Sequence, residues 1–408
     1  MLRRNIIYLS HGTKTKQTVN RRKGEKTVRT RRLGKTELQV SEIGFGGEWL
    51  ERHPEEHSVE LIRYASTKGI NIIDCWMADP KSRNIIGEAI KDNRSEWIVQ
   101  GHIGSVYKDG QYTKTRDMTY VPGAFEDLLT RLQTDYVDLG MIHFVDSEEE
   151  WDWIQTSDYL KYIMEQKAAG RVRHIGMSSH NPKVAIKAAR SGYIEMILFS
   201  INPAFDMLPA SEDINAMFVD EFDRSLKGID PDRARLYMAC EENDVGITVM
   251  KGFAGGRLFK PEASPFGVAM TPTHCIHYAL TRPAVCSILC GYDTKEQIDQ
   301  AVAYENATGE EKDYASVIAG APLHSYRGQC TYCGHCQPCP AGIDIAMVNK
   351  YDDLAAMQPE TPATLKAHYA ELSAHASDCL HCESCESRCP FGVRISERMT
   401  ATAERFGL

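Results

Sequence analysis

The sequence predicts an α/β fold in which a (β/α)8 TIM barrel is followed by a smaller, helical, cysteine-rich domain. Two observations predict it. Eight short β-rich runs alternate with amphipathic helical runs between residues 40 and 303, and eight of the thirteen cysteines fall in two blocks near the C-terminus. About 265 residues are enough for one such barrel. Hydrophobic residues make up 42% of the 408 residues and charged residues 25%, which excludes a wholly disordered or fibrous protein.

The helical runs end in Gly or Asn close to the next strand, as helix C-termini do. A closed barrel is preferred to an open doubly wound sheet because eight strands are expected and no Gly-x-Gly-x-x-Gly follows the first of them. Residues 33–41 are expected to form a hairpin that plugs the bottom of the barrel. The expected strands are residues 41–46, 70–74, 96–101, 136–143, 172–178, 194–200, 246–250 and 285–290.

Composition divides the chain into three parts. Residues 1–30 are expected to be a basic, disordered extension, residues 31–305 the barrel, and residues 306–408 a helical linker with the cysteine-rich domain. The basic extension has no aromatic interleaving, so nucleic acid is not an expected partner. No apolar run is long enough to cross a bilayer, and the start of the sequence has no secretory hydrophobic stretch. We expect a cytoplasmic protein without a membrane span.

The two cysteine blocks have the spacing of iron–sulfur ligands. Three cysteines at intervals of three, then a fourth followed by proline, can wrap a [4Fe–4S] cube, because each thiolate must reach a different iron. A disulfide framework does not suit a large chain without a signal peptide, and zinc usually takes two separated pairs. Two [4Fe–4S] clusters are therefore predicted, with paired zinc sites as the alternative. The predicted ligands are Cys330, Cys333, Cys336 and Cys339 in the first block and Cys379, Cys382, Cys385 and Cys389 in the second.

These blocks resemble the two-cluster bacterial ferredoxins. The resemblance implies a ferredoxin-like domain in which the fourth cysteine of each block binds the other cluster. Cys389 would join Cys330, Cys333 and Cys336, while Cys339 would join Cys379, Cys382 and Cys385. Two departures are a long insert at residues 340–378, expected to be helical, and a spacer of two residues instead of three before Cys339. The five remaining cysteines are expected to be small core residues: Cys75, Cys240, Cys275, Cys286 and Cys290.

Polar residues recur where the expected strands end, which is where TIM barrels carry their chemistry. Asp74 and His143 end apolar strands, so burial and a shifted pKa are expected for both. For Ser178 and Ser179 the alternative to a functional role is an N-cap of the following helix. In order, the strand ends carry Gly46 to Trp49, Asp74, His102, His143, Ser178 to His180, Asn202, Lys251 and Gly291.

The barrel segment resembles the aldo/keto reductases. The similarity runs from LGKTELQVSEIGFGG through GINIID, DYVDLGMIH, HIGMSSH and VMKGFAGGRL to YENA, about two-thirds of the chain. That family reduces carbonyls with a nicotinamide hydride at a site of Asp, Tyr, Lys and His. The resemblance matches the Asp to Asp74 and the His to His143, but Asp79 stands where the Tyr is expected and His102 where the Lys is expected.

This substitution changes the expected acid–base chemistry. An Asp is normally ionised near neutral pH and donates a proton poorly, whereas a His can donate one. We expect His102 to be a candidate proton donor, with Asp74 or Asp79 holding its other ring nitrogen. Asp74, Asp79, His102 and His143 together are the predicted catalytic set.

Signals for an organic cofactor are thin. The resemblance places Ile201 near the position of the nicotinamide-stacking Tyr, and Ser178-Ser179 where the family has Ser-Asn. Backbone amides of the loop that follows Lys251, with Gly255 and Gly256, and of the turn at Gly291 could cradle a phosphate, or could be simple tight turns. NAD(P) or a flavin is conceivable, but neither has a clear motif.

The leading hypothesis is an iron–sulfur oxidoreductase that acts on a small organic substrate in the barrel mouth. Electrons would pass one at a time through the two [4Fe–4S] clusters from or to an external partner protein, and the Asp/His set would handle protons. One alternative is an NAD(P)-dependent carbonyl reductase with His102 as proton donor. Another is a non-redox lyase, dehydratase or isomerase that uses the Asp/His set and has structural clusters. A third is a binding or electron-transfer subunit without its own active site.

Overall fold

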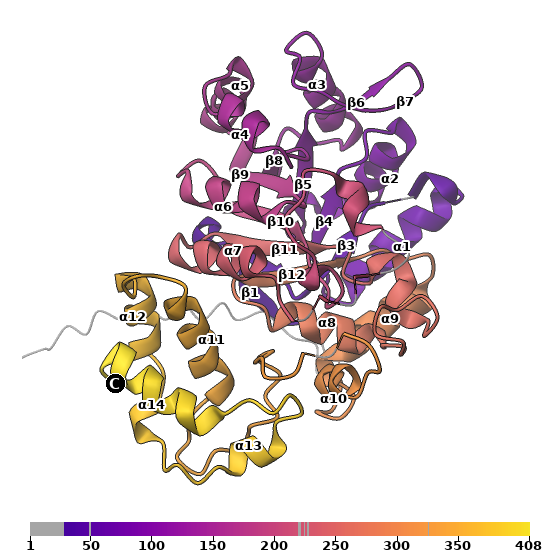
Figure 1. Ribbon diagram of the computed structural model, residues 1–408. Coiled ribbons are helices and arrows are strands. Elements are labelled where there is room, and N and C mark those ends of the chain that lie inside the picture. The colour runs from indigo at the N-terminus through magenta and orange to yellow at the C-terminus, as the bar shows by residue number, and fades with distance from the viewer. Residues whose placement is uncertain (1–27, 49, 219–221, 224, 227, 325) are drawn as a thin grey trace, which may run out of the picture.

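The computed structural model describes residues 28–408 except 49, 219–221, 224, 227 and 325 (Figure 1). Eight parallel strands close into a barrel in the order β10-β11-β12-β3-β4-β5-β8-β9. Each of the eight expected strands is confirmed, with ends shifted by up to two residues. The barrel strands are β3 (Ile43–Gly46), β4 (Ile72–Cys75), β5 (Ile98–Ile103), β8 (Val137–Ile142), β9 (Val172–Ser179), β10 (Met196–Ser200), β11 (Gly246–Met250) and β12 (Val285–Cys290).

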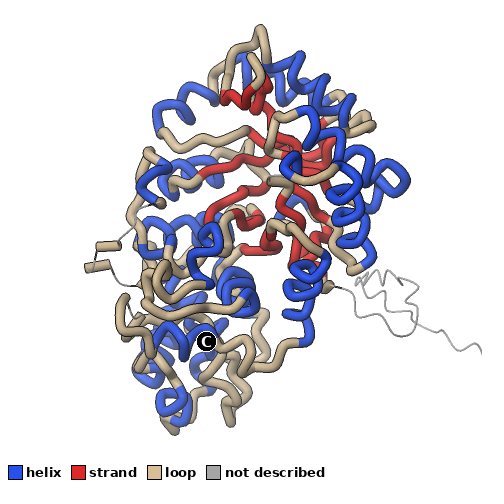
Figure 2. Tube along the Cα trace, turned by 90° about the vertical axis from the view of Figure 1, so that its right-hand side faces the viewer, coloured by secondary structure: helices blue, strands red, loops and turns tan. Residues whose placement is uncertain are grey.

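Helices cover the outside of the barrel, and the strands lie at its centre (Figure 2). Several of these helices start at an N-cap side chain that accepts a backbone N–H, as in α2, α5, α6 and α9. The helices of this layer are α1 (Glu55–Thr67), α2 (Pro80–Ile90), α3 (Val121–Arg131), α4 (Glu148–Ile154), α5 (Asp158–Ala168), α6 (Pro182–Arg190), α7 (Pro231–Glu242), α8 (Pro272–Leu280) and α9 (Lys295–Val302). Short 3-10 turns occupy Gly34–Thr36, Leu50–Arg52, Lys91–Glu96, Phe205–Met207, Ile214–Met217, Ala254–Phe259, Ala303–Asn306 and Ala376–Asp378.

The period of two along each strand decides which side chains enter the barrel. On β5, Ile98 belongs to the apolar cluster inside the barrel and Val99 to the core between strands and helices. The same alternation directs Gln100 and His102 inward, and both are at least 98% buried. Strand β4 pairs with β5 so that Asp74 lies opposite Gln100. The Asp74 side chain therefore also points into the barrel. The lower interior is therefore apolar and the upper interior polar.

The hairpin predicted at residues 33–41 closes the bottom of the barrel. Strand β1 (Thr30–Arg32) pairs antiparallel with β2 (Gln39–Ser41). Leu33 and Val40 are fully buried in the apolar cluster that fills the lower interior, which confirms the plug. Residues 1–27 of the expected basic extension lie outside the described residues, but its last three residues belong to the barrel. Val28 is 5% exposed, and Arg29 forms ion pairs with Glu42 and Glu305.

A second hairpin lies between β5 and α3. Strands β6 (Ser105–Lys108) and β7 (Gln111–Lys114) pair antiparallel, with Tyr107 opposite Tyr112. Asp109 and Gly110 form the turn, both with positive φ, as an Asp-Gly hairpin turn requires. The sequence carries this turn signal, although no strand was expected there.

The C-terminal domain packs beside α7 and α8 (Figure 1). Lys350 of α11 forms an ion pair with Glu241 of α7 at 2.7 Å. Tyr326 donates its hydroxyl proton to the carbonyl oxygen of Pro203, three residues after the end of β10. The insert at residues 340–378 is helical as predicted. The helices of this region are α10 (Tyr314–Ala319), α11 (Ile345–Ala356), α12 (Ala363–Ala370), α13 (Ser384–Arg388) and α14 (Ile395–Phe406).

Within the described part of the chain, no helix has the length and apolar character needed to cross a membrane.

Candidate active site

Asp74 and His102 meet inside the upper end of the barrel. His102 Nε2 lies 2.9 Å from Asp74 Oδ1, and the two side chains are nearly completely buried. Gln100 Nε2 also donates to Asp74 Oδ1 at 3.0 Å, and Thr248 Oγ1 donates to Gln100 Oε1 at 2.9 Å. Because Asp74 Oδ1 receives two donors, it acts as a carboxylate acceptor, and His102 carries its ring proton on Nε2.

His143 extends this contact. Its Nδ1 lies 2.8 Å from His102 Nδ1, and with a neutral His102 that carries its proton on Nε2, His143 Nδ1 is the donor. Burial lowers the pKa of His143 well below its usual value. His143 is therefore neutral, with a proton on Nδ1 and a lone pair on Nε2.

Tyr112 completes the arrangement, and sequence analysis missed it. Its hydroxyl donates to His143 Nε2 at 2.6 Å. Burial raises the pKa of Tyr112 to about 12, so the hydroxyl keeps its proton at neutral pH. We call Tyr112, His143, His102 and Asp74 the relay, because each O–H or N–H in it donates to the next member in that order.

Trp76 forms one wall beside the relay. Its ring is stacked on His143 with a centroid distance of 6.1 Å, and Tyr112 meets its edge at 5.5 Å. The Trp76 carbonyl oxygen also accepts from Ser105 Oγ at the start of the β6–β7 hairpin. This contact fixes the hairpin on the barrel mouth, by which we mean the C-terminal ends of the barrel strands and the loops that follow them.

Asp79 does not join the predicted catalytic set. Its Oδ1 accepts the backbone N–H of Ser82 at 3.0 Å, which makes Asp79 the N-cap of α2. Among the described residues no hydrogen bond connects it to Asp74, His102 or His143. The expectation that Asp79 holds a ring nitrogen of His102 is corrected, because the free backbone N–H groups of α2 engage its carboxylate. Asp74 alone holds His102.

Ser178 and Ser179 are both committed to protein contacts. Ser178 Oγ accepts the backbone N–H of Phe144 at 2.8 Å, and Ser179 Oγ donates to Asp146 Oδ1 at 3.0 Å. The alternative interpretation of these serines as N-caps is wrong, because Asn181 caps α6. Their predicted role in cofactor binding stays a prediction.

Next to Ser179, Asp146 and His180 form a second buried acid–imidazole pair. His180 Nδ1 lies 2.9 Å from Asp146 Oδ2, and the backbone N–H of His180 donates to Asp146 Oδ1 at 2.6 Å. Burial alone would raise the pKa of Asp146, but hydrogen bonds from His180 and Ser179 lower it overall. Burial lowers the pKa of His180. The pair is therefore an ionised carboxylate with a neutral imidazole.

Lys251 follows β11 with an unusual backbone. Its φ is +57°, a left-handed value that costs a non-glycine residue free energy and is concentrated at functional sites. Burial lowers the pKa of Lys251, while Glu48, Asp146 and Asp74 act in the opposite direction. The Lys251 ammonium is thus subject to the negative charge of three carboxylates at the barrel mouth.

The predicted phosphate cradle has an open backbone. A Cβ atom added at Gly255, Gly256 or Gly291 would meet no atom within 4 Å, so a ligand has room there. By contrast, Gly47 is required by close packing, since a Cβ there would lie 2.2 Å from the carbonyl oxygen of Asp74. Gly47 therefore lets the chain after β3 lie close against the backbone at the end of β4, and the role of the other three glycines stays a prediction.

The five cysteines outside the two blocks are buried, as expected. Burial raises the pKa of Cys75 to about 12 and that of Cys290 to about 12. Neither thiol is therefore activated at neutral pH, and both serve as small core residues.

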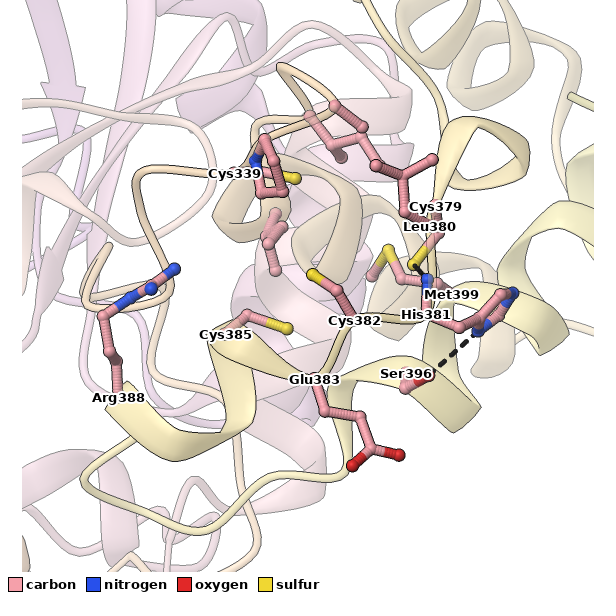
Figure 3. A pocket seen from close by; sticks show the side chains of 14 residues that line it. Cys339, Cys379, Leu380, His381, Cys382, Glu383, Cys385, Arg388, Ser396 and Met399 are labelled. Atoms are coloured by element: carbon pink, nitrogen blue, oxygen red, sulfur yellow. Dashed lines mark hydrogen bonds between the residues drawn. The ribbon is translucent and has the colours of Figure 1, made fainter.

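The eight block cysteines are distributed over two cavities. Cys339, Cys379, Cys382 and Cys385 line one cavity, and their side chains converge on a common space (Figure 3). A second cavity is lined by Cys330, Cys333, Cys336 and Cys389. Each cavity thus combines three cysteines of one block with the last cysteine of the other. This is the crossed pairing that the ferredoxin resemblance implies.

The geometry of these sets does not suit a single ion. No group of three or more His, Cys, Asp or Glu side chains in the described ranges converges closely enough to hold one metal ion. A mononuclear site such as zinc needs all ligands about 2.3 Å from one point, whereas a cube spreads four thiolates over four irons. Four cysteines around each cavity match the ligand type and number that a [4Fe–4S] cluster takes.

The barrel segment is similar in sequence to known proteins. A model of the "Aldo/keto reductase family" matches residues 42–273. The uncharacterized oxidoreductase YqkF of Bacillus subtilis is 28% identical over 292 residues, which covers 69% of this chain and 92% of that protein. The aldo-keto reductase YhdN of the same bacterium is 30% identical over 156 residues, covering 36% of this chain and 46% of that protein.

A solved structure agrees with the fold. The holo form of an aldo-keto reductase from Bacillus halodurans superposes with a TM-score of 0.54 at 22% identity, covering 70% of this chain and 94% of that chain. The family match ends at residue 273, before the first cysteine block. From the barrel, its strand-end residues and these similarities together, the chain belongs to the aldo/keto reductase family and is an oxidoreductase.

Proposed function

We propose that the protein interconverts a carbonyl and an alcohol group of a small organic molecule in the barrel mouth, with two [4Fe–4S] clusters as its redox groups. The observation that carries the proposal is the relay. Four side chains from β4, β5, the end of β8 and the β6–β7 hairpin are joined by three hydrogen bonds of 2.6 to 2.9 Å. Such an arrangement can move one proton between a substrate oxygen at Tyr112 and the buried carboxylate of Asp74.

The hydrogen-bond directions define how this transfer proceeds. When a substrate hydroxyl gives its proton to Tyr112 Oη, the proton of Tyr112 passes to His143 Nε2. His143 then passes its Nδ1 proton to His102, and His102 passes its Nε2 proton to Asp74. Each link moves one proton across one bond, so no buried charge has to travel alone. Carbonyl reduction runs the same sequence backwards, starting from protonated Asp74, and supplies the proton that ends on oxygen. The two electrons would come one at a time from the external electron donor, and the second proton, which ends on carbon, would come from water.

In this proposal Tyr112 takes the place of the missing family tyrosine. The family resemblance puts that residue at position 79, where an Asp caps α2. Tyr112 instead comes from the β6–β7 hairpin and reaches His143 from above. Because both ring nitrogens of His102 are bonded within the relay, His102 acts on a substrate through His143 and Tyr112.

The two cysteine sets fit the clusters by ligand type and by their arrangement around two cavities. Bound [4Fe–4S] clusters transfer single electrons, which would let an external electron-transfer protein exchange reducing equivalents with the enzyme. Arg388 of α13 connects the two cysteine blocks. Its guanidinium group donates hydrogen bonds to the carbonyl oxygens of Cys336 and Pro338 in the first block. Tyr326 and Arg282 attach the first cysteine block to the barrel, through Pro203 and through the carbonyl oxygen of Thr331.

The second candidate is the NAD(P)-dependent carbonyl reductase. The family match and the open glycines at positions 255, 256 and 291 favour it. The relay would serve it equally well, because a hydride donor supplies two electrons together with the hydrogen on carbon, and the relay supplies the proton on oxygen.

An anaerobic assay distinguishes the two. Purified, iron-reconstituted protein is supplied with a panel of small aldehydes and ketones and with either reduced methyl viologen or NADPH, and product is measured by mass spectrometry. We expect reduction with viologen that is abolished in Cys333→Ala and Cys382→Ala and retained in the core variant Cys275→Ala. Reduction by NADPH that is unchanged in both cluster variants would establish the second candidate instead.

A further inference from the structure

We propose that the two cysteine sets differ in redox role, and that Thr331, Asn349 and Arg282 raise the reduction potential of a cluster at the first set above that at the second. The first set is Cys330, Cys333, Cys336 and Cys389, and the second set is Cys339, Cys379, Cys382 and Cys385. The inference rests on the proposed function, because it concerns the clusters named there. It identifies the set that holds electrons next to the barrel.

The two sets differ in their access to solvent. Cys382 of the second set is exposed, and Leu380, which lines the same cavity, is 66% exposed. Cys336 of the first set is only 7% exposed. Reduction adds one negative charge to a cluster, and water stabilises that charge. Burial therefore disfavours reduction at the first set unless protein groups take the place of the water.

The cavity of the first set has polar atoms that could do this. Thr331 is 1% exposed, and its Oγ1 is buried without a hydrogen-bond partner among the described residues. Asn349 of α11 lines the same cavity, is also 1% exposed, and its Oδ1 has no partner in that part of the chain. Rotation about one bond exchanges the two ends of the amide, so Asn349 can turn its NH₂ group into the cavity. A hydroxyl and an amide can both donate hydrogen bonds to cluster sulfur atoms, and such bonds raise the reduction potential.

The cavity of the second set is different. His381 Nδ1 and Ser396 Oγ, which line it, lie 2.9 Å apart and are bonded to each other (Figure 3). Arg388 Nε is a buried atom without a partner at this cavity. However, Arg388 lies to one side of the four sulfur atoms in Figure 3, and it donates to the carbonyl oxygens of Cys336 and Pro338. Its charge therefore acts on both sets and does not distinguish them.

Arg282 supplies a fixed positive charge to the first set. It is 2% exposed, its Nη2 donates to the carbonyl oxygen of Thr331, and its guanidinium lies 5.0 Å from the centre of the Tyr332 ring. Its Nη1 is buried without a partner in the described residues. The carboxylate whose charge acts on it, Asp206, is already paired with Arg233. Because an arginine keeps its charge at working pH, Arg282 favours the reduced state of a neighbouring cluster.

The other charges support the same order. Near the first set, Asp353 pairs with Arg398 at 2.6 Å and His335 pairs with Asp313 at 2.9 Å. At the second cavity the exposed carboxylate of Glu383 disfavours an added electron. An electron from the external electron-transfer protein therefore enters at the exposed second set and moves to the first set, so that the second is oxidised as the first is reduced.

An anaerobic redox titration of the iron-reconstituted protein, followed by electron paramagnetic resonance without substrate, tests this order. We expect two midpoint potentials at least about 59 mV apart, which is a tenfold difference in equilibrium constant for one electron. Cys389→Ala should lose the higher potential and Cys339→Ala the lower one. Equal potentials, or the reverse assignment, would overturn the proposal.

Two further variants test the named side chains. Arg282→Gln removes the charge and keeps an amide donor for Thr331, so the higher potential should fall about tenfold in equilibrium constant, or about 59 mV. Thr331→Val keeps the side-chain shape and removes the hydroxyl, so the same potential should fall about threefold, or about 28 mV. The lower potential should stay constant in both. An unchanged higher potential in Thr331→Val and in any folded Arg282→Gln protein would overturn the proposal.

Ser396→Ala is the matched control, because it removes a hydroxyl that lines the other cavity. It should leave the higher potential unchanged, and a fall equal to that of Thr331→Val would overturn the proposal. Loss of turnover with both potentials as expected would count against the proposed function alone. A single potential with retained turnover would count against this inference alone, and protein that takes up no iron would overturn both.

Discussion

Tyr112 and His143 are joined by a 2.6 Å hydrogen bond, although 31 positions separate them in the sequence. The bond exists because the β6–β7 hairpin folds back over the barrel mouth, where Ser105 and Trp76 hold its base. In the proposed function, this bond makes the partly buried Tyr112 hydroxyl the end of the relay that faces the substrate.

Replacing Tyr112 by Phe removes that terminus while keeping the ring against Trp76. We expect kcat to fall by about 10²-fold or more, the usual contribution of a positioned acid or base, with a small change in KM. Steady-state kinetics on the preferred carbonyl measures it. Tyr107→Phe is the matched control, because Tyr107 is the cross-strand partner of Tyr112 and is 40% exposed. Equal rates for the two variants would exclude Tyr112 from the relay.

The crossed cysteine pairing predicts which cluster each single variant loses. Cys389→Ala should empty the site of the first block, and Cys339→Ala that of the second. Iron content should fall from about eight to about four atoms per chain in both cases. Electron paramagnetic resonance of the reduced variants should show two different remaining signals. Identical remaining signals would contradict the crossed assignment.

Partly buried His277 on α8 makes stability depend on pH. Burial, together with Lys312 and Arg282, lowers its pKa from 6.5 to about 4. The unfolded chain therefore binds a proton between pH 6.5 and 4 that the folded protein does not, so the free energy of unfolding falls as pH falls through this range. Between pH 7 and 5 this group contributes a loss of about 2 kcal/mol.

Urea unfolding of His277→Gln at pH 7 and pH 5 tests this. The variant should lose about 2 kcal/mol less than the parent protein between these pH values. His57→Gln, at an exposed position on α1, should behave as the parent. An unchanged pH dependence in His277→Gln would refute the assignment.

Asp206 is expected to anchor residues 202–231 at the barrel mouth. It is fully buried, accepts from the hydroxyls of Tyr237 and Tyr278 at 2.7 Å each, and pairs with Arg233 at 3.4 Å. Asp206→Ala leaves the Arg233 cation buried without its carboxylate, which should cost about 3–5 kcal/mol of unfolding free energy. Urea unfolding measures the loss. Glu262→Ala, on an exposed loop, should cost about 0.5 kcal/mol or less, and a similar small loss for Asp206→Ala would contradict the anchoring role.

Much of this protein follows from local sequence pattern. The alternation of β-rich and helical runs predicts all eight barrel strands, because strand and helix periods are imposed by the backbone itself. The same period of two gives His102 the inward phase of Ile98, and the strand ends locate Asp74 and His143. The spacing of the cysteine blocks indicates cluster ligands, since nearby thiolates must reach different irons of one cube.

Tertiary structure decided the rest, since these contacts join residues far apart in the sequence. Tyr112 belongs to the relay only because a hairpin folds over the barrel mouth. Asp79 is not part of the relay because its carboxylate accepts a backbone N–H from the first turn of α2. His180 keeps its ring proton on Nδ1 because Asp146, which follows the preceding barrel strand, accepts it there. Pattern encodes which way a side chain points from its own backbone; which group it meets depends on how distant elements pack against each other.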